Sequence, residues 1–270
     1  MTTPLPAVVS ALDRLGRATV GGVRTLGFAT MLCVDSIAHV LTGWRSGQPV
    51  RIAAVIRQMR QIGADALPIV ALLAFTVGLM LGIQFIAALS EFGAQSQVVL
   101  AVAKSVAREF GALITAILVA GRSGSALAAR VGAMTVSQEV DALAVMGIEP
   151  VRYLVAPALL AMLVMLPALT IIADAVAIFG AALYCAPALD VTPLAYVGQT
   201  LALLSPGDLW QGIAKAFVFA LLITLIGVSN GFSVTGGAEG VGRATTRAVV
   251  LSISWIIVVD MVFSFFLNRP

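Results

Sequence analysis

Charged residues are scarce in this chain of 270 residues, because Asp, Glu, Lys and Arg together make up only 11% of it. Hydrophobic residues account for 60%, and the mean hydropathy is +1.05. A soluble globular domain contains about 25% charged residues, so this composition excludes that class and indicates an integral membrane protein. Short segments of alternating hydrophobicity are also absent, which argues against a transmembrane β-barrel.

Histidine and cysteine, two of the usual metal ligands, are almost missing. His39 is the single histidine, which excludes a multi-histidine metal site and leaves one candidate base for a Ser-His-Asp arrangement. Cys33 and Cys185 lie far apart in apolar surroundings, without metal-ligand spacing, and we interpret them as buried packing thiols. We therefore expect no catalytic residue, no metal site and no cofactor in this chain.

A phosphate-binding loop for ATP is absent as well. Neither lysine, Lys104 or Lys215, follows a glycine, so the pattern GxxxxGK does not occur and any ATP would be hydrolysed by another subunit. The amino-terminal residues do not read as a cleaved signal peptide, because the first basic residue is Arg14, and we expect them to be retained. The net charge of +3 is interpreted as headgroup contact and orientation, with no nucleic-acid partner.

Five long apolar segments predict an all-α integral membrane protein, since about 20 apolar residues suffice for one crossing. The predicted spans cover residues 66–89, 98–121, 153–185, 209–229 and 248–267. The third span is longer than a membrane requires and contains Pro157 and Pro167, so we expect it to tilt, kink or protrude.

Glycine is frequent, with 25 residues, and two pairs have the GxxxG spacing that allows helices to approach closely. These pairs are Gly78 with Gly82 and Gly227 with Gly231. We interpret both pairs as helix-packing positions, because this spacing is common in apolar segments and by itself indicates no chemistry.

The first part of the chain, residues 1–62, is predicted to form an interfacial region ahead of a five-span domain at 63–270. Amphipathic helices are expected at 5–17 and 52–62, with an interfacial or re-entrant piece at 25–44 between them. If the amino terminus is cytoplasmic, most of the 16 Lys and Arg residues lie at or near cytoplasmic segments. The distribution therefore predicts a cytoplasmic amino terminus and an external carboxyl terminus.

The stretch MTVSQEVDALAVMGIEP, between the second and third spans, predicts a short cytoplasmic helix over about 135–146. Thr135 and Gln138 have capping-box spacing, Gly147 suits the left-handed residue after a helix, and Pro150 prevents continuation. Its apolar stripe could dock into a partner's groove, although an ordinary interfacial connector fits the pattern equally well. The stripe consists of Val136, Val140 and Leu143.

Six ionisable residues fall within the predicted spans, where each costs roughly 2.5–3.5 kcal/mol at membrane depth. They are Lys104, Arg108, Glu109, Asp174, Lys215 and Asp260. Lys104 and Arg108 share a helical face and would repel each other unless an anion or carboxylate lies between them. Glu109 points about 100° away from Arg108 and can pair across helices. Pairing among Asp174, Lys215 and Asp260 is plausible. These charged residues could form structural ion pairs, or they could line a cavity that receives a phosphate-bearing headgroup. In the second case Arg108 is best suited to bidentate contact with the phosphate.

Three longer motifs follow one another in the chain: REFGALITAILVAGRSGSALAARVG at 108–132, MTVSQEVDALAVMGIEPVRYLVAP at 134–157, and GGAEGVGRATTRAVVLSIS at 236–254, followed by Asp260. In this order they resemble the MlaE/YrbE permeases of ABC lipid transporters that work with MCE-domain proteins. The resemblance extends from about residue 63 to the carboxyl terminus. One departure is Ala158, where the family commonly has arginine after the proline that opens the third span.

The resemblance implies a permease homodimer in the inner membrane of a Gram-negative cell, with phospholipid as its cargo. The implied partners are a cytoplasmic ABC ATPase, which would bind ATP and Mg, and a periplasmic ring of MCE-domain protein. By motif position the substrate-binding residues would be Arg108, Glu109, Lys215 and Asp260. The residues of the helix that meets the ATPase would include Ser137, Gln138, Glu139, Asp141, Leu143 and Met146.

Two other functions are compatible with the sequence. In a secondary transporter or channel the buried charges would relay ions or protons, although no convincing internal repeat is found. A membrane scaffold for an MCE protein would tolerate loss of Arg108, Glu109 and Lys215 provided that it still folded. A permease should instead lose transport while its complex still assembles.

Overall fold

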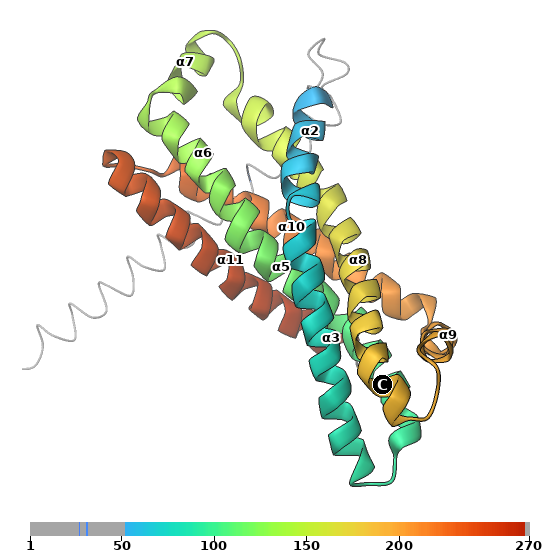
Figure 1. Cartoon of the computed structure of the whole chain (residues 1–270). Coiled ribbons are helices and arrows are strands. Elements are labelled where there is room, and N and C mark those ends of the chain that lie inside the picture. The colour runs from blue at the N-terminus through green and yellow to red at the C-terminus, as the bar shows by residue number, and fades with distance from the viewer. Residues whose placement is uncertain (1–26, 28–30, 32–51, 268–270) are drawn as a thin grey trace, which may run out of the picture.

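A computed structural model of the chain describes residues 27, 31 and 52–267 (Figure 1). Within these residues every regular element is helical, and five helical stretches are long and apolar enough to cross a membrane. They are Ile52–Ser90, Gln95–Val136, Val151–Ala188, Pro206–Phe232 and Gly237–Leu267. The predicted all-α membrane fold with five spans is confirmed. The predictions for 5–17 and 25–44 lie outside the described residues, apart from residues 27 and 31.

The first stretch consists of α2 (Ile52–Met59), a π-helical segment η1 (Arg60–Ala64) and α3 (Leu67–Ser90). The predicted amphipathic helix at 52–62 is therefore not separated from the first span by a loop. Pro68 lies in the first turn of α3, where its missing N–H would have had no partner within the helix.

The second stretch contains two π-helical segments between three α-helices. After a short 3-10 turn, η2 (Gln95–Gln97), it runs through α4 (Val98–Ser105), η3 (Val106–Phe110), α5 (Gly111–Val119), η4 (Ala120–Gly124) and α6 (Ser125–Val136). The predicted end at residue 121 was too early, because the helix continues beyond Arg122 and Arg130. π-Helical turns are rare and frequently mark functional sites.

The third span begins with η5 (Val151–Val155) and continues as α8 (Ala156–Ala188), which contains Pro167 and Pro187. It is followed by α9 (Pro193–Leu203), α10 (Pro206–Phe232) and α11 (Gly237–Leu267). The helix α11 starts well before the predicted residue 248, so the glycine-rich segment at its start is helical.

Helices α3 and α8 approach each other most closely at glycines. A Cβ atom on Gly78 would overlap the carbonyl oxygen of Ala177, and one on Gly180 would overlap the carbonyl oxygen of Phe75. A Cβ atom on Gly82 would in turn press on the sulfur of Cys185, which is fully buried as a free thiol. The predicted close approach at the first GxxxG pair and the packing interpretation of this cysteine are confirmed.

Helix α10 packs in the same way on the second stretch. A Cβ atom on Gly227 would lie 3.1 Å from the carbonyl oxygen of Gly124, and one on Gly231 would lie 2.7 Å from the Cβ of Val131. A Cβ atom on Gly212 would overlap the carbonyl oxygen of Ala107. The second GxxxG pair therefore also packs helices together, and backbone contact extends to the π-helical turn η3.

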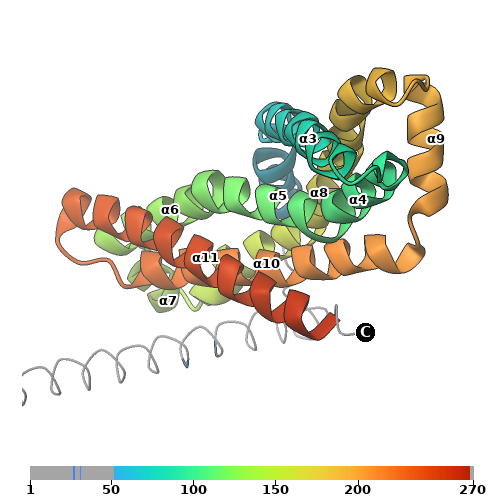
Figure 2. The ribbon, with the colours of Figure 1, turned by 90° about the horizontal axis from the view of Figure 1, so that it is seen from below.

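Helix α11 lies along α6 and α10 but buries few of its side chains (Figure 2). Its buried residues are Gly240, Ala248, Ser252 and Ile256, all in its first two thirds. Large apolar side chains are exposed on its last third, among them Met261, Val262, Phe265 and Phe266. This face is suited to lipid or to another apolar surface.

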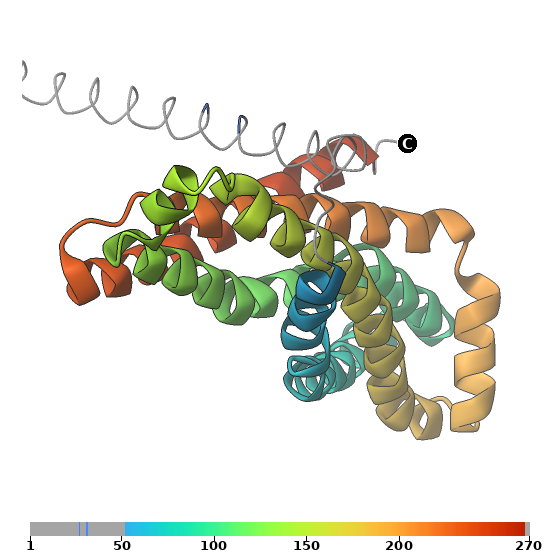
Figure 3. The same cartoon turned by 90° about the horizontal axis from the view of Figure 1, so that it is seen from above.

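The two short helices α7 and α9 lie at different ends of the bundle (Figure 1). Helix α9 crosses one end and joins α8 to α10 (Figure 3). Thr192 caps it by accepting a hydrogen bond from the N–H of Ala195 at 3.2 Å. Tyr196 of α9 is fully buried, and this burial raises the pKa of its phenol, so the hydroxyl stays neutral.

Candidate functional site

Lys215 is the centre of an ionic network that joins the second, fourth and fifth spans. It lies in α10 with its side chain fully buried. Its Nζ is 2.5 Å from Oε2 of Glu109 in η3 and 2.9 Å from Oδ1 of Asp260 in α11. It also donates to Oγ of Ser264 at 3.3 Å, and Ser264 donates to Oε1 of Glu109 at 2.8 Å. Three of the four predicted substrate-binding residues are therefore brought together.

The ammonium group of Lys215 is fully buried and enclosed by three partners in this arrangement. An ammonium carries three N–H donors; it donates to Glu109 and Ser264, and its contact with Asp260 is an ion pair without a hydrogen bond. Two carboxylates surround one ammonium, so the network has an excess of negative charge when both are ionised. A phosphate could reach the nitrogen only if at least one of these contacts opened.

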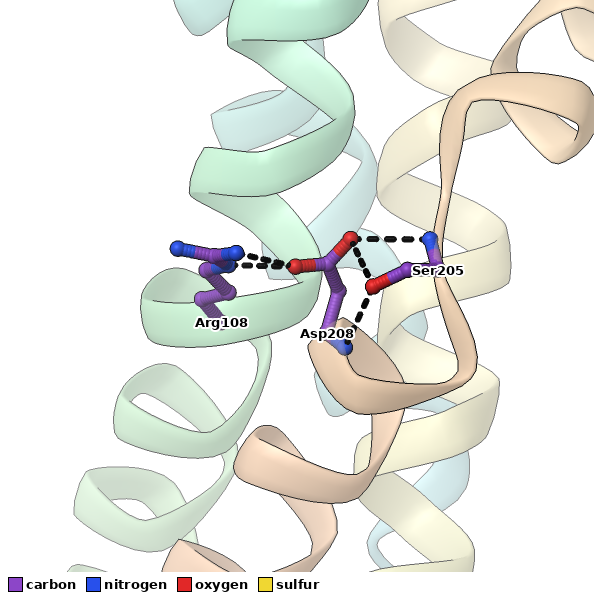
Figure 4. A network of polar contacts seen from close by, with 3 residues as sticks. All are labelled: Arg108, Ser205 and Asp208. Atoms are coloured by element: carbon purple, nitrogen blue, oxygen red, sulfur yellow. Dashed lines mark hydrogen bonds and ion pairs between the residues drawn. The ribbon is translucent and has the colours of Figure 1, made fainter. Parts of the chain in front are cut away.

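Arg108, the fourth predicted substrate-binding residue, makes a separate contact one residue earlier in η3. Its Nε and Nη2 both lie 2.5 Å from Oδ1 of Asp208 in the first turn of α10 (Figure 4). The other carboxylate oxygen of Asp208 accepts from the N–H of Ser205 at 2.8 Å and from its hydroxyl at 2.9 Å. Asp208 thus supplies a carboxylate beside Arg108, but it makes no ion pair with Lys104 and so does not bridge the two basic residues as the sequence analysis considered.

Asp208 and Ser205 were not singled out in the sequence, although a signal for them exists. Ser205-Pro206-Gly207-Asp208 places an acid three residues after a serine, with proline at the first helical position, which is a capping-box pattern. Ser264 gives no such signal, because a serine in an apolar helix is an ordinary packing residue.

Asp174 does not join the network, contrary to the pairing considered for it. It lies in α8 with 7% of its surface exposed, and a Cβ atom on Gly111 would overlap its Oδ1. The close approach of α5 at this glycine makes room for the carboxyl group, and Oδ1 has no hydrogen-bond partner among the described residues.

The short helix between the second and third spans is α7 (Glu139–Val145), which is shorter than predicted. The predicted capping box is wrong, because the hydroxyl of Thr135 donates to the carbonyl of Val131 within α6. Gln138 precedes α7 in a left-handed conformation with φ of 59°, and its side chain makes no capping hydrogen bond.

The end of α7 agrees with the sequence. Gly147 has a φ of 74°, the left-handed conformation predicted for it. Its N–H donates to Ala144, and the N–H of Ile148 donates to Leu143, which together form a Schellman motif. Pro150 then precedes the first turn of the third span.

Five of the six predicted ATPase-contacting residues are exposed around α7. They are Ser137, Gln138, Glu139, Asp141 and Met146. Leu143 is 9% exposed and Val140 is half-buried, so these two residues of the predicted apolar stripe face the protein and hold the helix in place, whereas Val136, the third, lies at the end of α6 and is exposed. The outward apolar surface lies instead at the end of α7, where Val145 is 90% and Met146 64% exposed.

These features together define a helical membrane protein with charged side chains paired between spans and a short exposed helix at one end. The family profile described as Permease MlaE matches residues 55–266, which covers almost all of the described chain. The chain therefore belongs to the MlaE permease family, and it has the role of an ABC transporter permease subunit.

Curated relatives agree with this assignment, and the two bacterial ones match over nearly their full length. A protein of Rickettsia felis named "Probable ABC transporter permease protein" is 32% identical over 251 residues, covering 93% of this chain and 95% of the relative. The "Intermembrane phospholipid transport system permease protein MlaE" of Haemophilus influenzae is 30% identical over 262 residues, covering 95% of this chain and 97% of the relative. The Arabidopsis thaliana "Protein TRIGALACTOSYLDIACYLGLYCEROL 1, chloroplastic" is 35% identical over 211 residues, covering 78% and 60%.

Proposed function

We propose that this chain is the permease of a transporter that moves phospholipid between the inner membrane and an outer-membrane pathway, powered by a separate ATPase. The observation that carries the proposal is the family match over 55–266, which includes all five spans. The Haemophilus relative named for intermembrane phospholipid transport supports phospholipid as the cargo. In this proposal the ATPase binds ATP and Mg, and the permease itself catalyses no reaction.

Helix α7 is the proposed contact with the ATPase. Glu139 and Asp141 are exposed acids in its first turn, and Val145 and Met146 form an exposed apolar end, so a partner would meet both charge and an apolar anchor. Leu143 fixes α7 to the bundle beneath. A push on α7 would therefore pass directly into α6 and η5, which flank it in the chain.

The proposed lipid cavity lies between two copies of the chain. Arg108 and Glu109 have 33% and 28% of their side chains exposed at the outside of a single copy. In a homodimer two such faces would enclose a shared polar cavity. Arg108 has 33% of its side chain exposed and carries a guanidinium group suited to phosphate, whereas Lys215 is fully buried, so Arg108 is better placed to contact a phosphate first.

The proposed orientation places the amino terminus and α7 in the cytoplasm, and α9 and the carboxyl terminus on the other side. The proposal takes the five spans among the described residues as the full set, which separates the two termini, and the basic residues near α7 favour the cytoplasm for that end. A periplasmic MCE-domain protein would then meet the end that carries α9. The membrane is the bacterial inner membrane in this proposal.

The test is ATP hydrolysis and phospholipid transfer by the complex purified through this chain, with co-purifying subunits and lipid identified by mass spectrometry. Glu139→Arg reverses a charge on α7 and should detach or uncouple the ATPase. The matched control is Glu91→Arg, an equal charge reversal at an exposed position after α3, which should leave hydrolysis unchanged.

Two outcomes would overturn the proposal. A chain that purifies without an ATPase and still conducts solute in vesicles is a secondary transporter or channel. A complex that keeps full lipid transfer after Arg108→Ala and Glu109→Ala, while it still assembles, contains this chain as a scaffold for an MCE protein.

A further inference from the structure

A cavity of about 350 Å³ opens where the first, second and third spans meet, away from the ionic network. This volume is within the range of roughly 300–1,000 Å³ that small-molecule sites occupy. Its polar lining comes from Gln58, Gln61, Asp65, Arg122, Ser123 and Arg130. Its apolar lining comes from Ile62, Ala126, Leu127, Ala158 and Met162.

Two arginines give this cavity a net positive lining. Arg122 approaches Asp65 only to 3.9 Å, and both side chains are nearly half exposed, so this pair is weak. Arg130 lies about two turns further along the same helical stretch and makes no hydrogen bond or ion pair with any described residue. One carboxylate therefore faces two guanidinium groups, and the charge of the lining is not balanced.

The cavity is bordered by two of the π-helical turns. The turn η1 contributes Gln61 and Ile62, and the turn η4 contributes Arg122 and Ser123. The geometry of η4 is supported by Ser125, whose hydroxyl donates to the carbonyl oxygens at 121 and 122 at 2.5 and 2.8 Å. Two rare turns at one cavity are a second indication, independent of charge, that the site is functional.

The position of the cavity fits a membrane boundary. Asp65 lies two residues before the start of α3, whose 24 residues are about 36 Å long and sufficient to cross the hydrocarbon core. The cavity therefore lies at the end of the first span, at the end of the bundle where α2, α6 and α7 lie (Figure 1). Arg122 follows Arg108 by roughly 20 Å of helix, so the cavity is distinct from the ionic network.

We propose that this cavity binds a phosphate group, supplied by the headgroup of a phospholipid in the leaflet on the α7 side. The two guanidinium groups would donate to the phosphate oxygens, with further donation from the glutamine amides and the hydroxyl of Ser123. The apolar wall around Met162 and Leu127 would contact the glycerol and the first acyl carbons. This inference adds a binding site to the proposed lipid transport. The choice of phospholipid and of the leaflet on the α7 side rests on the proposed function.

The test is photo-crosslinking of the full-length chain, purified in detergent, to phosphatidylglycerol that carries a photoreactive headgroup. Crosslinked peptides are then identified by mass spectrometry, with crosslinks expected in 58–65 and 122–130. Arg122→Gln with Arg130→Gln should weaken binding at least about tenfold, because two charged hydrogen-bonding groups are lost. The matched control is Arg57→Gln with Arg60→Gln, which removes equal charge nearby from residues outside the cavity lining.

A second variant fills the cavity without changing its charge. Ala126 lines the cavity and is exposed, so Ala126→Trp should occupy the site and reduce crosslinking to a similar extent while the chain stays folded. This variant decides the question if the double arginine variant fails to fold.

Competitors separate the possible sources of the phosphate. Unlabelled phosphatidylglycerol should compete, whereas diacylglycerol, which lacks phosphate, should not. Competition by millimolar inorganic phosphate without competition by unlabelled phosphatidylglycerol would overturn the lipid assignment and indicate a site for free phosphate. Unchanged crosslinking in both cavity variants, or equal competition by diacylglycerol, would overturn the proposal. No ATPase is needed, so failure here is distinct from failure of the proposed transport function.

Discussion

Replacement of Lys215 by methionine tests most directly whether its buried ammonium stabilises the carboxylates of Glu109 and Asp260. The variant keeps the length of the side chain but removes the ammonium between Glu109 and Asp260, leaving two carboxylates that face each other in a buried site. Loss of one partner from a buried ion pair costs about 3–5 kcal/mol. At roughly 2–4 °C per kcal/mol, the apparent melting temperature should fall by roughly 6–20 °C.

The assay is thermal unfolding of the detergent-purified chain, followed by size-exclusion chromatography of the material that stays monodisperse. The triple variant Glu109→Gln, Lys215→Met and Asp260→Asn should recover most of the loss, because neutral replacement of a complete buried ionic group is often neutral or stabilising. Arg243→Gln, which breaks an exposed pair with Glu239, is the control and should cost less than about 1 kcal/mol. The reasoning is refuted if Lys215→Met has the same apparent melting temperature as Arg243→Gln. It is also refuted if the triple variant is as unstable as Lys215→Met alone.

Three further predictions concern packing, capping and the end of α7. Gly180→Ala should destabilise by about 1–3 kcal/mol in thermal unfolding, because its Cβ would overlap a carbonyl oxygen of α3, whereas Gly198→Ala in α9 meets no atom within 4 Å and should be neutral or stabilising. Asp208→Asn should lower stability by about 1–3 kcal/mol in the same assay, because a buried charged contact and part of a helix cap are weakened together; an unchanged melting temperature would contradict the geometry. Gly147→Ala should raise the rate of limited proteolysis near α7 roughly fivefold or more, since a residue with a Cβ pays about 1–2 kcal/mol at its φ of 74°; equal cleavage of both chains would contradict this expectation.

Hydropathy alone predicted the five spans, since the free energy of burying an apolar helix in lipid depends on composition and length. It failed at the helix ends. The prediction ended the second span at residue 121 because Arg122 and Arg130 are charged, but the helix continues where these side chains line a cavity instead of entering lipid. The start of α11 was missed for a similar reason: glycines indicate a turn, yet the Glu239–Arg243 pair at 2.8 Å supports a helical turn there.

The helix near residue 139 shows why a capping pattern by itself is ambiguous. A threonine hydroxyl can accept from the backbone at the start of a helix or donate to a carbonyl one turn back, and sequence does not distinguish the two. Thr135 does the second, so α6 extends to Val136 and α7 begins only at Glu139. The glycine at the other end was predicted correctly, because few residues other than glycine adopt its left-handed backbone.

The charged residues of the site were identified from their cost in a membrane, and the pairing considered between Lys215 and Asp260 is present, but the pairing of Arg108 with Asp208 was not anticipated. Glu109 pairs across helices as its helical position suggested, whereas the hydrogen bond from Lys215 to Ser264 involves a distant residue with no distinctive sequence context. The π-helical turns were also beyond sequence reasoning, since no propensity scale separates them from α-helix. They change which side chains face a neighbour, and so they bear directly on both proposed binding sites.

The earlier part of α11 is held to the bundle by apolar packing, whereas the later part is held by an ion pair and hydrogen bonds. Its earlier part is fastened by small and apolar buried side chains from Gly240 to Ile256, which interlock with α6 and α10 and have no alternative partners. Its later part is fastened mainly by Asp260 and Ser264, whose contacts can be exchanged for other ions or hydrogen-bond donors. The later part of the fifth span can therefore separate from the bundle more readily than the earlier part, and a change of charge at Asp260 is what would release it.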